Sequence, residues 1–246
     1  MDKPDETDPY PLHTAARLTQ IRVLESLLAV NPKLTLKVDE DGRLPIHWAC
    51  TTTSLDVIRA ILDATPRKSF DPDATDSSGW TPLMISASLP SDGGLAAIDL
   101  LIARDADVKI QSNNGGTALH FATSKQNVDV VRKLLSSGAS ARVKDKRGQS
   151  PLHRAAAVGN LPLVKLLLST GKSQVDATDM DGSSALHHAI SEGHGDVAVE
   201  LMKQGADSGK LDREERLAID CAPDATVRQY VLRQAEMEGI DVVGGE

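Results

Sequence analysis

Short segments of this chain carry apolar residues at the spacing of one helix face, with polar stretches between them. Val57, Ile58, Ile61 and Leu62 form one such face, and segments 163–168 and 197–202 repeat it. Apolar side chains at this spacing form the buried side of a short helix. In the middle of the chain the pattern predicts one helix over 118–123 and a second over 130–135, so we expect packed helix pairs.

A four-residue helix-start motif precedes the first helix of each pair. Its six copies are Tyr10-Pro11-Leu12-His13, Leu44-Pro45-Ile46-His47, Thr81-Pro82-Leu83-Met84, Thr117-Ala118-Leu119-His120, Ser150-Pro151-Leu152-His153 and Ser184-Ala185-Leu186-His187. The steps between their fourth residues are 34, 37, 36, 33 and 34, and a degraded seventh copy is Leu217-Ala218-Ile219-Asp220. The ankyrin repeat has a period of about 33 residues and a T-P-L-H tetrapeptide. The chain resembles an all-α solenoid of seven ankyrin repeats, helix-turn-helix units with β-hairpin tips that form a curved stack with a concave binding face.

The predicted tips have a regular chemistry. Glycine stands two residues before five of the motifs, and in four of these tips an aspartate comes three residues before the glycine. The glycines are Gly42, Gly79, Gly115, Gly148 and Gly182, and the aspartates are Asp39, Asp76, Asp145 and Asp179. Glycine tolerates the positive φ of a tight turn, and an aspartate can accept the amide hydrogens of that turn. Ser112 takes the place of the aspartate in the remaining tip.

The repeats predict a single ankyrin-repeat domain over residues 10–237. Residues 1–9 are acidic and contain proline, so we expect them to be disordered. Residues 238–246 are expected to be a flexible tail. The last repeat is polar, as the terminal unit of a solenoid needs to be.

Composition narrows the function. The formal net charge is −8, which disfavours nucleic acid and anionic membranes as partners. The chain shows no signal peptide and no apolar run of membrane length, and its two cysteines lie far apart along the repeats. These features favour the reducing cytoplasm and nucleus. The acidic caps offer no apolar end face, so we expect a monomer.

The chemistry of an enzyme is not apparent. Five of the seven histidines occupy the fourth motif position, where we expect buried rings that hydrogen-bond within and between repeats. Phosphate-binding, nucleophile-elbow and zinc-protease motifs do not occur. We therefore expect no enzymatic activity, no metal and no cofactor.

Repeat positions that face the concave surface supply the candidate partner-binding residues. They are Arg43, Trp80, Lys125, Lys146, Arg147, Arg17, Asp41 and Glu40. Trp and Arg dominate interface hot spots, so Trp80 is a candidate anchor, or else it packs against a neighbouring tip. The basic residues either meet an acidic partner or are solvated charges that balance Asp145 and Asp181. Trp48, inside a first helix, is expected in the core.

Three stretches are more specific than the ankyrin consensus. Asp39-Glu40-Asp41-Gly42-Arg43-Leu44-Pro45-Ile46-His47-Trp48-Ala49, Asp76-Ser77-Ser78-Gly79-Trp80-Thr81-Pro82 and His153-Arg154-Ala155-Ala156-Ala157-Val158-Gly159-Asn160-Leu161 look like those of the gankyrin family. Segment 192–196 looks like the fungal members. This resemblance implies a chaperone for assembly of the proteasome regulatory particle, which holds the C-terminal domain of a base ATPase subunit and blocks premature docking on the core particle.

The resemblance also implies which residues make the contact. The family's basic contacts carry over to Arg43 and Lys125. The retinoblastoma-binding L-x-C-x-E element is not kept, because Leu186-His187-His188-Ala189-Ile190 stands in its place. The alternative is a generic ankyrin adaptor or inhibitor in signalling or transcription that uses the same surface.

Overall fold

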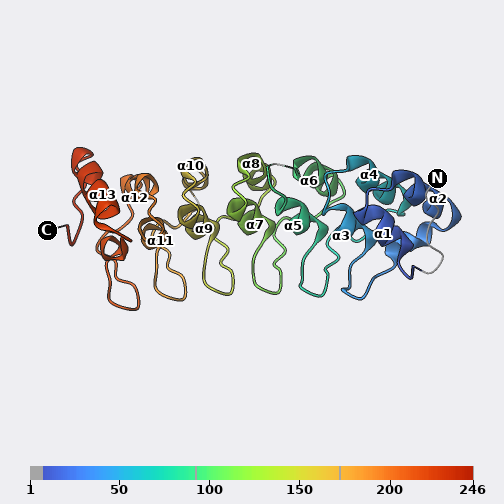
Figure 1. The fold of residues 1–246 in the computed structure, drawn as a ribbon, viewed down its shortest axis with the longest axis horizontal. Coiled ribbons are helices and arrows are strands. Elements are labelled where there is room, and N and C mark those ends of the chain that lie inside the picture. Colours follow the sequence, from blue (N-terminus) through green and yellow to red (C-terminus); the bar gives the residue numbers. More distant parts are fainter. Residues whose placement is uncertain (1–7, 92, 172, 246) are drawn as a thin grey trace. The chain divides into compact units, whose positions relative to one another are not determined.

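The computed structural model describes residues 8–91, 93–171 and 173–245, which fold into pairs of antiparallel helices (Figure 1). They group into two compact units that divide between residues 113 and 114. The helices of the first unit are α1 (Pro11–Arg17), α2 (Ile21–Val30), η1 (Pro32–Leu36), α3 (Pro45–Ala49), α4 (Leu55–Ala64), α5 (Pro82–Ala87) and α6 (Leu95–Ile102). Those of the second are α7 (Ala118–Ser124), α8 (Val128–Ser136), α9 (Pro151–Ala157), α10 (Leu161–Ser169), α11 (Ala185–Ser191), α12 (Gly195–Lys203), η2 (Ala218–Cys221) and α13 (Ala225–Met237).

The all-helical repeat prediction is confirmed, and the two helices expected near the middle of the chain are α7 and α8. The predicted tips are turns between the helix pairs, and within each unit Figure 1 shows them as loops that project from the helices. Over the described residues they contain no strand, only isolated antiparallel bridges between Thr178 and Ser184 and between Leu211 and Leu217. The expectation of β-hairpins is therefore corrected: the tips of the described residues are turns closed by backbone hydrogen bonds, such as that from the Asp145 amide to the Gln149 carbonyl at 2.9 Å.

Three of the motif histidines tie a helix start to the next repeat. His120 Nδ1 accepts the amide hydrogen of Thr117 at 3.1 Å, and its Nε2 lies 3.2 Å from the carbonyl oxygen of Gln149 in the following tip. Because Nδ1 is an acceptor, the proton sits on Nε2 and the ring is neutral. His47 and His187 make the same two contacts. The prediction of buried histidines that bond within and between repeats is therefore confirmed for these three, whereas His13 Nδ1 and His153 Nε2 have no hydrogen-bond partner among the described residues.

The tip glycines are needed for their conformation and for space. All five have φ between 73° and 77°. A Cβ on Gly148 would lie 2.9 Å from the amide nitrogen of Met180, because Met180 donates to the Arg147 carbonyl in the adjoining tip. In the last repeat Glu215 replaces this glycine yet keeps a positive φ of 59°. The predicted left-handed turn is therefore confirmed, and it persists in the degraded copy.

The two ends differ from the body of the chain. The predicted disorder of residues 1–9 falls mostly on residues 1–7, which lie outside the described part. After α13 the chain turns back: Arg228 Nη2 donates to the Gly244 carbonyl at 2.6 Å, and the Val243 amide donates to Ser208 Oγ at 3.2 Å. The flexibility of this tail in solution stays a prediction.

The buried histidines predict that the protein loses stability in mild acid. Burial lowers the pKa of His120 and of His153 to about 4, from an ordinary value of 6.5. Their neutral forms therefore contribute stability that is complete above pH 6.5 and is lost as the pH falls from 6.5 to 4. We expect each to cost roughly 2 kcal/mol at pH 5. Urea unfolding at pH 7.5 and 5.0 measures the loss, and His120→Gln should reduce it; equal stability at both pH values would contradict it.

The close approach at Gly148 predicts a large effect of one methyl group. Gly148→Ala forces a left-handed alanine and a clash with the next tip, so we expect a loss of about 2–4 kcal/mol in unfolding free energy. Gly138 is a matched control, since it has φ 95° and nothing within 4 Å of an added Cβ. Gly138→Ala should cost only about 1–2 kcal/mol. Equal losses for the two variants would show that the contact between tips is unimportant.

Candidate protein-binding site

Arg43 is held from two sides within the first unit. It directly follows the tip glycine, and its Nε donates to Asp76 Oδ2 at 3.1 Å. Its guanidinium carbon lies 4.8 Å from the centre of the Trp48 ring. The side chain is 28% exposed, whereas that of Asp76 is 3% exposed. A partner can therefore reach Arg43, although part of its hydrogen-bonding capacity serves the fold.

Trp48 on α3 is not a core residue, so that expectation is wrong. The ring is half-buried, and its indole N–H donates to Asp39 Oδ2 at 2.7 Å. Arg17, the last residue of α1, also lies over this ring, with its guanidinium carbon 5.7 Å from the centre. The indole needs a hydrogen-bond partner and the two cations favour its π face, which keeps the ring at the surface.

One rule explains why these side chains meet. The residue after the fourth motif position donates to the tip aspartate nine residues earlier: Trp48 to Asp39, Arg154 to Asp145 and His188 to Asp179. In the third repeat this position is Ile85, which has no donor. Asp76 receives its bond from Arg43 instead. Arg43 therefore supplies the donor that its neighbouring repeat lacks.

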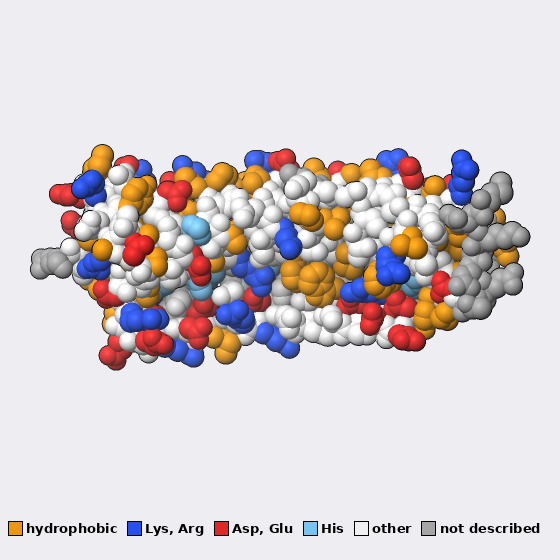
Figure 2. Space-filling view, viewed as in Figure 1, with side chains coloured by type: hydrophobic (Ala, Val, Ile, Leu, Met, Phe, Trp, Pro, Cys, Tyr) orange, Lys and Arg blue, Asp and Glu red, His pale blue; other side chains and the backbone are white. Residues whose placement is uncertain are grey.

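The other candidates of the first unit lie on the same two tips. Glu40 and Asp41 are exposed, and the Asp41 carbonyl accepts the amide hydrogen of Ser77 at 2.9 Å, which joins one tip to the next. Trp80 is half-buried, and its amide donates to Asp76 Oδ1 at 2.9 Å. In Figure 2 basic side chains lie against hydrophobic ones just below α3, on the side from which the tips project.

The second unit carries Lys125, Lys146 and Arg147, all exposed. Lys125 follows α7, and the other two are on the tip that starts with Asp145. Arg154 Nη2 donates to Asp145 Oδ2 at 2.6 Å, and its Nη1 donates to Ser124 Oγ at 3.0 Å. Asp145 is thus paired with Arg154. Whether the tip cations meet an acidic partner or are solvated charges stays a prediction.

Hydrogen bonds to two of the tip aspartates lower the pKa values of their carboxyl groups. Although burial would raise the pKa of Asp39, the hydrogen bonds from Trp48 and from the amides of Arg43 and Asp41 outweigh it, and the pKa is lowered. Bonds from Arg154 and two turn amides do the same at Asp145. These carboxylates stay ionised at neutral pH. Sequence reasoning missed Trp48 and Arg154 as donors; their spacing of nine residues from the tip aspartates is the signal that could have found them.

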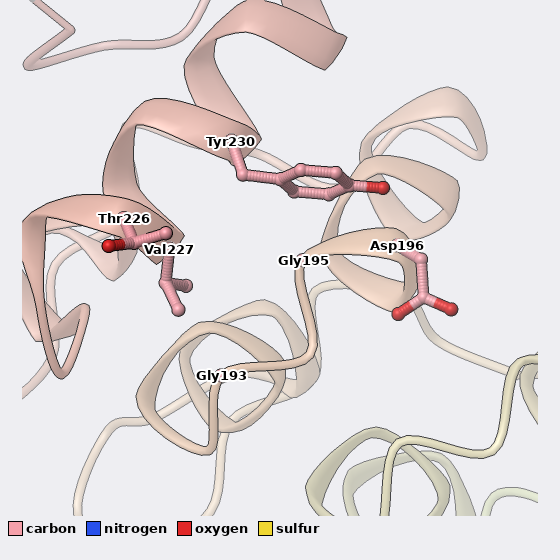
Figure 3. Close-up of a pocket in the computed structure, with 6 residues that line it drawn as sticks. All are labelled: Gly193, Gly195, Asp196, Thr226, Val227 and Tyr230. Atoms are coloured by element: carbon pink, nitrogen blue, oxygen red, sulfur yellow. The ribbon is translucent and has the colours of Figure 1, made fainter.

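A surface hollow between the last repeats has a different character. It is lined by Gly193, Gly195, Asp196, Thr226, Val227 and Tyr230. Figure 3 shows the Tyr230 ring reaching from α13 over Gly195 toward Asp196. A single carboxylate lies among these residues. Across the described residues no group of three or more His, Cys, Asp or Glu could hold a metal ion, and none of the helices there could cross a membrane.

Comparison with known proteins agrees with the repeat architecture. The family described as "Ankyrin repeats (3 copies)" matches residues 66–145 and 137–212. A solved ankyrin repeat domain of Bcl-3 has a TM-score of 0.71 and 28% identity, covering 92% of this chain and 99% of its own. The ankyrin repeat domain of human ASB11 has a TM-score of 0.80 and 22% identity, and the match covers 91% of this chain and 97% of that domain.

Two fungal relatives are closer in sequence. The Saccharomyces cerevisiae protein named "Probable 26S proteasome regulatory subunit p28" is 39% identical over 226 residues, which is 91% of this chain and 97% of that protein. An ankyrin repeat-containing protein of Schizosaccharomyces pombe is 36% identical over 171 residues, 70% and 73% of the two chains. The chain therefore belongs to the ankyrin-repeat family and, within it, to the fungal gankyrin family.

Proposed function

We propose that this protein is an assembly chaperone of the proteasome regulatory particle. It binds the C-terminal domain of a base ATPase subunit and so blocks premature docking of the base on the core particle. The observation that carries the proposal is the 39% identity, over almost the whole length of both chains, to a protein named as a probable 26S proteasome regulatory subunit. The accessible cations Arg43 and Lys125 supply the contacts that such a role needs.

The proposed mechanism is steric and stoichiometric. Ankyrin repeats present extended surfaces of exposed side chains, so they bind protein domains without catalytic groups. Arg43 and Lys125 pair with acidic side chains of the ATPase domain and set its register. Trp80 adds apolar contact, and Lys146 and Arg147 extend the basic contact along the second unit. The chaperone works as a monomer in the cytoplasm and nucleus, without enzymatic activity.

Arg43 serves the fold and the partner through different atoms. Its Nε is bonded to Asp76, and its guanidinium carbon lies 4.8 Å from the centre of the Trp48 ring. The two terminal nitrogens are the groups that a carboxylate of the partner can engage in a fork. Arg43 is thus held in position before the partner arrives, which lowers the entropic cost of binding.

Removing both cations should abolish tight binding to the ATPase domain. We choose Arg43→Gln with Lys125→Gln, because a glutamine can still donate an N–H to the buried Asp76 whereas a glutamate would repel it. Loss of charge pairs buried at an interface costs about 2–5 kcal/mol, against about 1 or less for exposed pairs. We expect at least a tenfold rise in Kd by isothermal titration.

The matched control is Arg59→Gln with Arg132→Gln, which removes the same charge from exposed positions on α4 and α8. It should bind like the unmodified protein, and thermal unfolding shows whether each variant is folded. Unchanged affinity of the Arg43 and Lys125 variant would refute the proposed contacts.

Purification of the tagged protein from its native cell tests the assignment itself. We expect mass spectrometry to find base ATPase subunits without core-particle subunits, because a chaperone that blocks docking leaves before the core particle binds. Enrichment of kinases or transcription factors, with no proteasome subunits, would return the chain to the adaptor class. Core-particle subunits in equal amount would contradict the blocking mechanism.

A further inference from the structure

The first unit holds an aromatic ring with two cations over it. The guanidinium carbons of Arg17 and Arg43 lie 5.7 Å and 4.8 Å from the centre of the Trp48 ring. Both distances are within the range of about 6 Å in which a cation is attracted to an aromatic ring. The cations come from residues 26 positions apart in the sequence, on α1 and on the tip before α3. They are therefore brought together by the ring and not by their own helix.

The ring is fixed by the fold. Its N–H is bonded to Asp39 Oδ2 at 2.7 Å, while Asp39 Oδ1 accepts the amide hydrogens of Asp41 and Arg43. Arg43 is fixed in turn by Asp76. Arg17 is exposed, and among the described residues the ring is the contact that the structure gives its guanidinium. Trp48 thus joins an exposed cation to one that is held by an ion pair.

The acidic side chains near the Trp48 ring limit which anionic ligands can bind there. Asp39 and Asp76 are committed to turn amides and side-chain donors, as described above. Glu40 and Asp41 are exposed on the same tip and repel a large polyanion such as nucleic acid, in a protein whose net charge is −8. A short segment with two carboxylates offers one anion to each guanidinium and brings far less negative charge to the tip acids than a polyanion does. Residues one helical turn apart have Cβ atoms about 5–6 Å apart, so a helix can present two carboxylates on one face.

We propose that Arg17, Trp48 and Arg43 form one binding site for two neighbouring carboxylates of an acidic protein segment, with Trp48 as the positioning residue for both cations. This deepens the proposed function, on which the identity of the partner rests: the segment belongs to the bound ATPase domain. Arg17 thereby becomes a specificity-determining contact equal in kind to Arg43. Trp48 acts through the two arginines.

The first experiment measures binding of the ATPase domain to four single variants at two salt concentrations. Arg17→Ala and Trp48→Leu should each weaken binding about two- to fivefold and reduce the salt dependence. Trp48→Phe keeps the ring and should restore most of the affinity. Arg22→Ala, an exposed charge on α2, is the control and should change neither quantity.

The double variant of Arg17 and Trp48 shows whether Trp48 positions the cations or only supports the fold. In the Arg17→Ala background, Trp48→Leu should weaken binding less than it does alone, since one of its two cations is gone. Additive effects, or an effect of Arg22→Ala as large as that of Arg17→Ala, would overturn the proposal. Because Arg17 is exposed, Arg17→Ala tests the site even if a Trp48 variant does not fold.

A second probe does not depend on the ATPase domain. A helical peptide with two glutamates one turn apart should shift the Trp48 indole N–H resonance, and its glutamine analogue should not. The shift should vanish in Arg17→Ala and persist in Arg22→Ala. If the peptide shifts the resonance but no base ATPase domain binds, the site stands and the proposed function fails. If the ATPase domain binds and the peptide causes no shift, or inorganic phosphate causes an equal one, the inference fails.

Discussion

The aspartate carboxylate that starts four of the five glycine-containing tips is the interaction on which the rest of those repeats depends. One oxygen accepts two amide hydrogens of the turn, as Asp145 Oδ1 does from Arg147 and Gln149, both at 2.9 Å. The other oxygen takes a side-chain donor. These bonds fix the turn that places the tip's last carbonyl, Gln149, against His120 of the preceding repeat. A carboxylate left without donors in this setting would cost several kcal/mol, so each tip recruits them.

The source of that donor decides which side chains remain for binding. Where the donor comes from the same repeat, as Arg154 does for Asp145, the arginine is committed to the fold. Where the repeat has no donor, as in the third, Asp76 takes Arg43 from the previous tip. Arg43 and Arg154 are both departures from the ankyrin consensus, but for different reasons. The first uses its Nε to join two tips, whereas the second uses both terminal nitrogens, one on the aspartate of its own tip and one on Ser124 of the preceding repeat.

Chemistry that recurs at a fixed position of the repeat could be predicted from the sequence, and contacts specific to one pair of repeats could not. The glycines, the tip aspartates and the motif histidines recur at the repeat period, so spacing is enough to assign them. The helix pairs follow for the same reason. The environment of Trp48 depends on Arg17, Asp39 and Arg43 together. A single apolar pattern cannot show that three polar groups converge on one indole, so the residue was expected in the core.

Net charge was also a weaker guide than local geometry. A formal charge of −8 would slow the approach of an acidic partner at long range, yet exposed charges are screened beyond about 8 Å at physiological ionic strength. Within that distance the partner meets the particular groups that the tips present. Tip carboxylates such as Asp76, with a side chain 3% exposed, face inward to their donors, whereas the guanidiniums that they and Trp48 hold face outward. The same bonds that stabilise the turns therefore allow an acidic protein to present a basic contact.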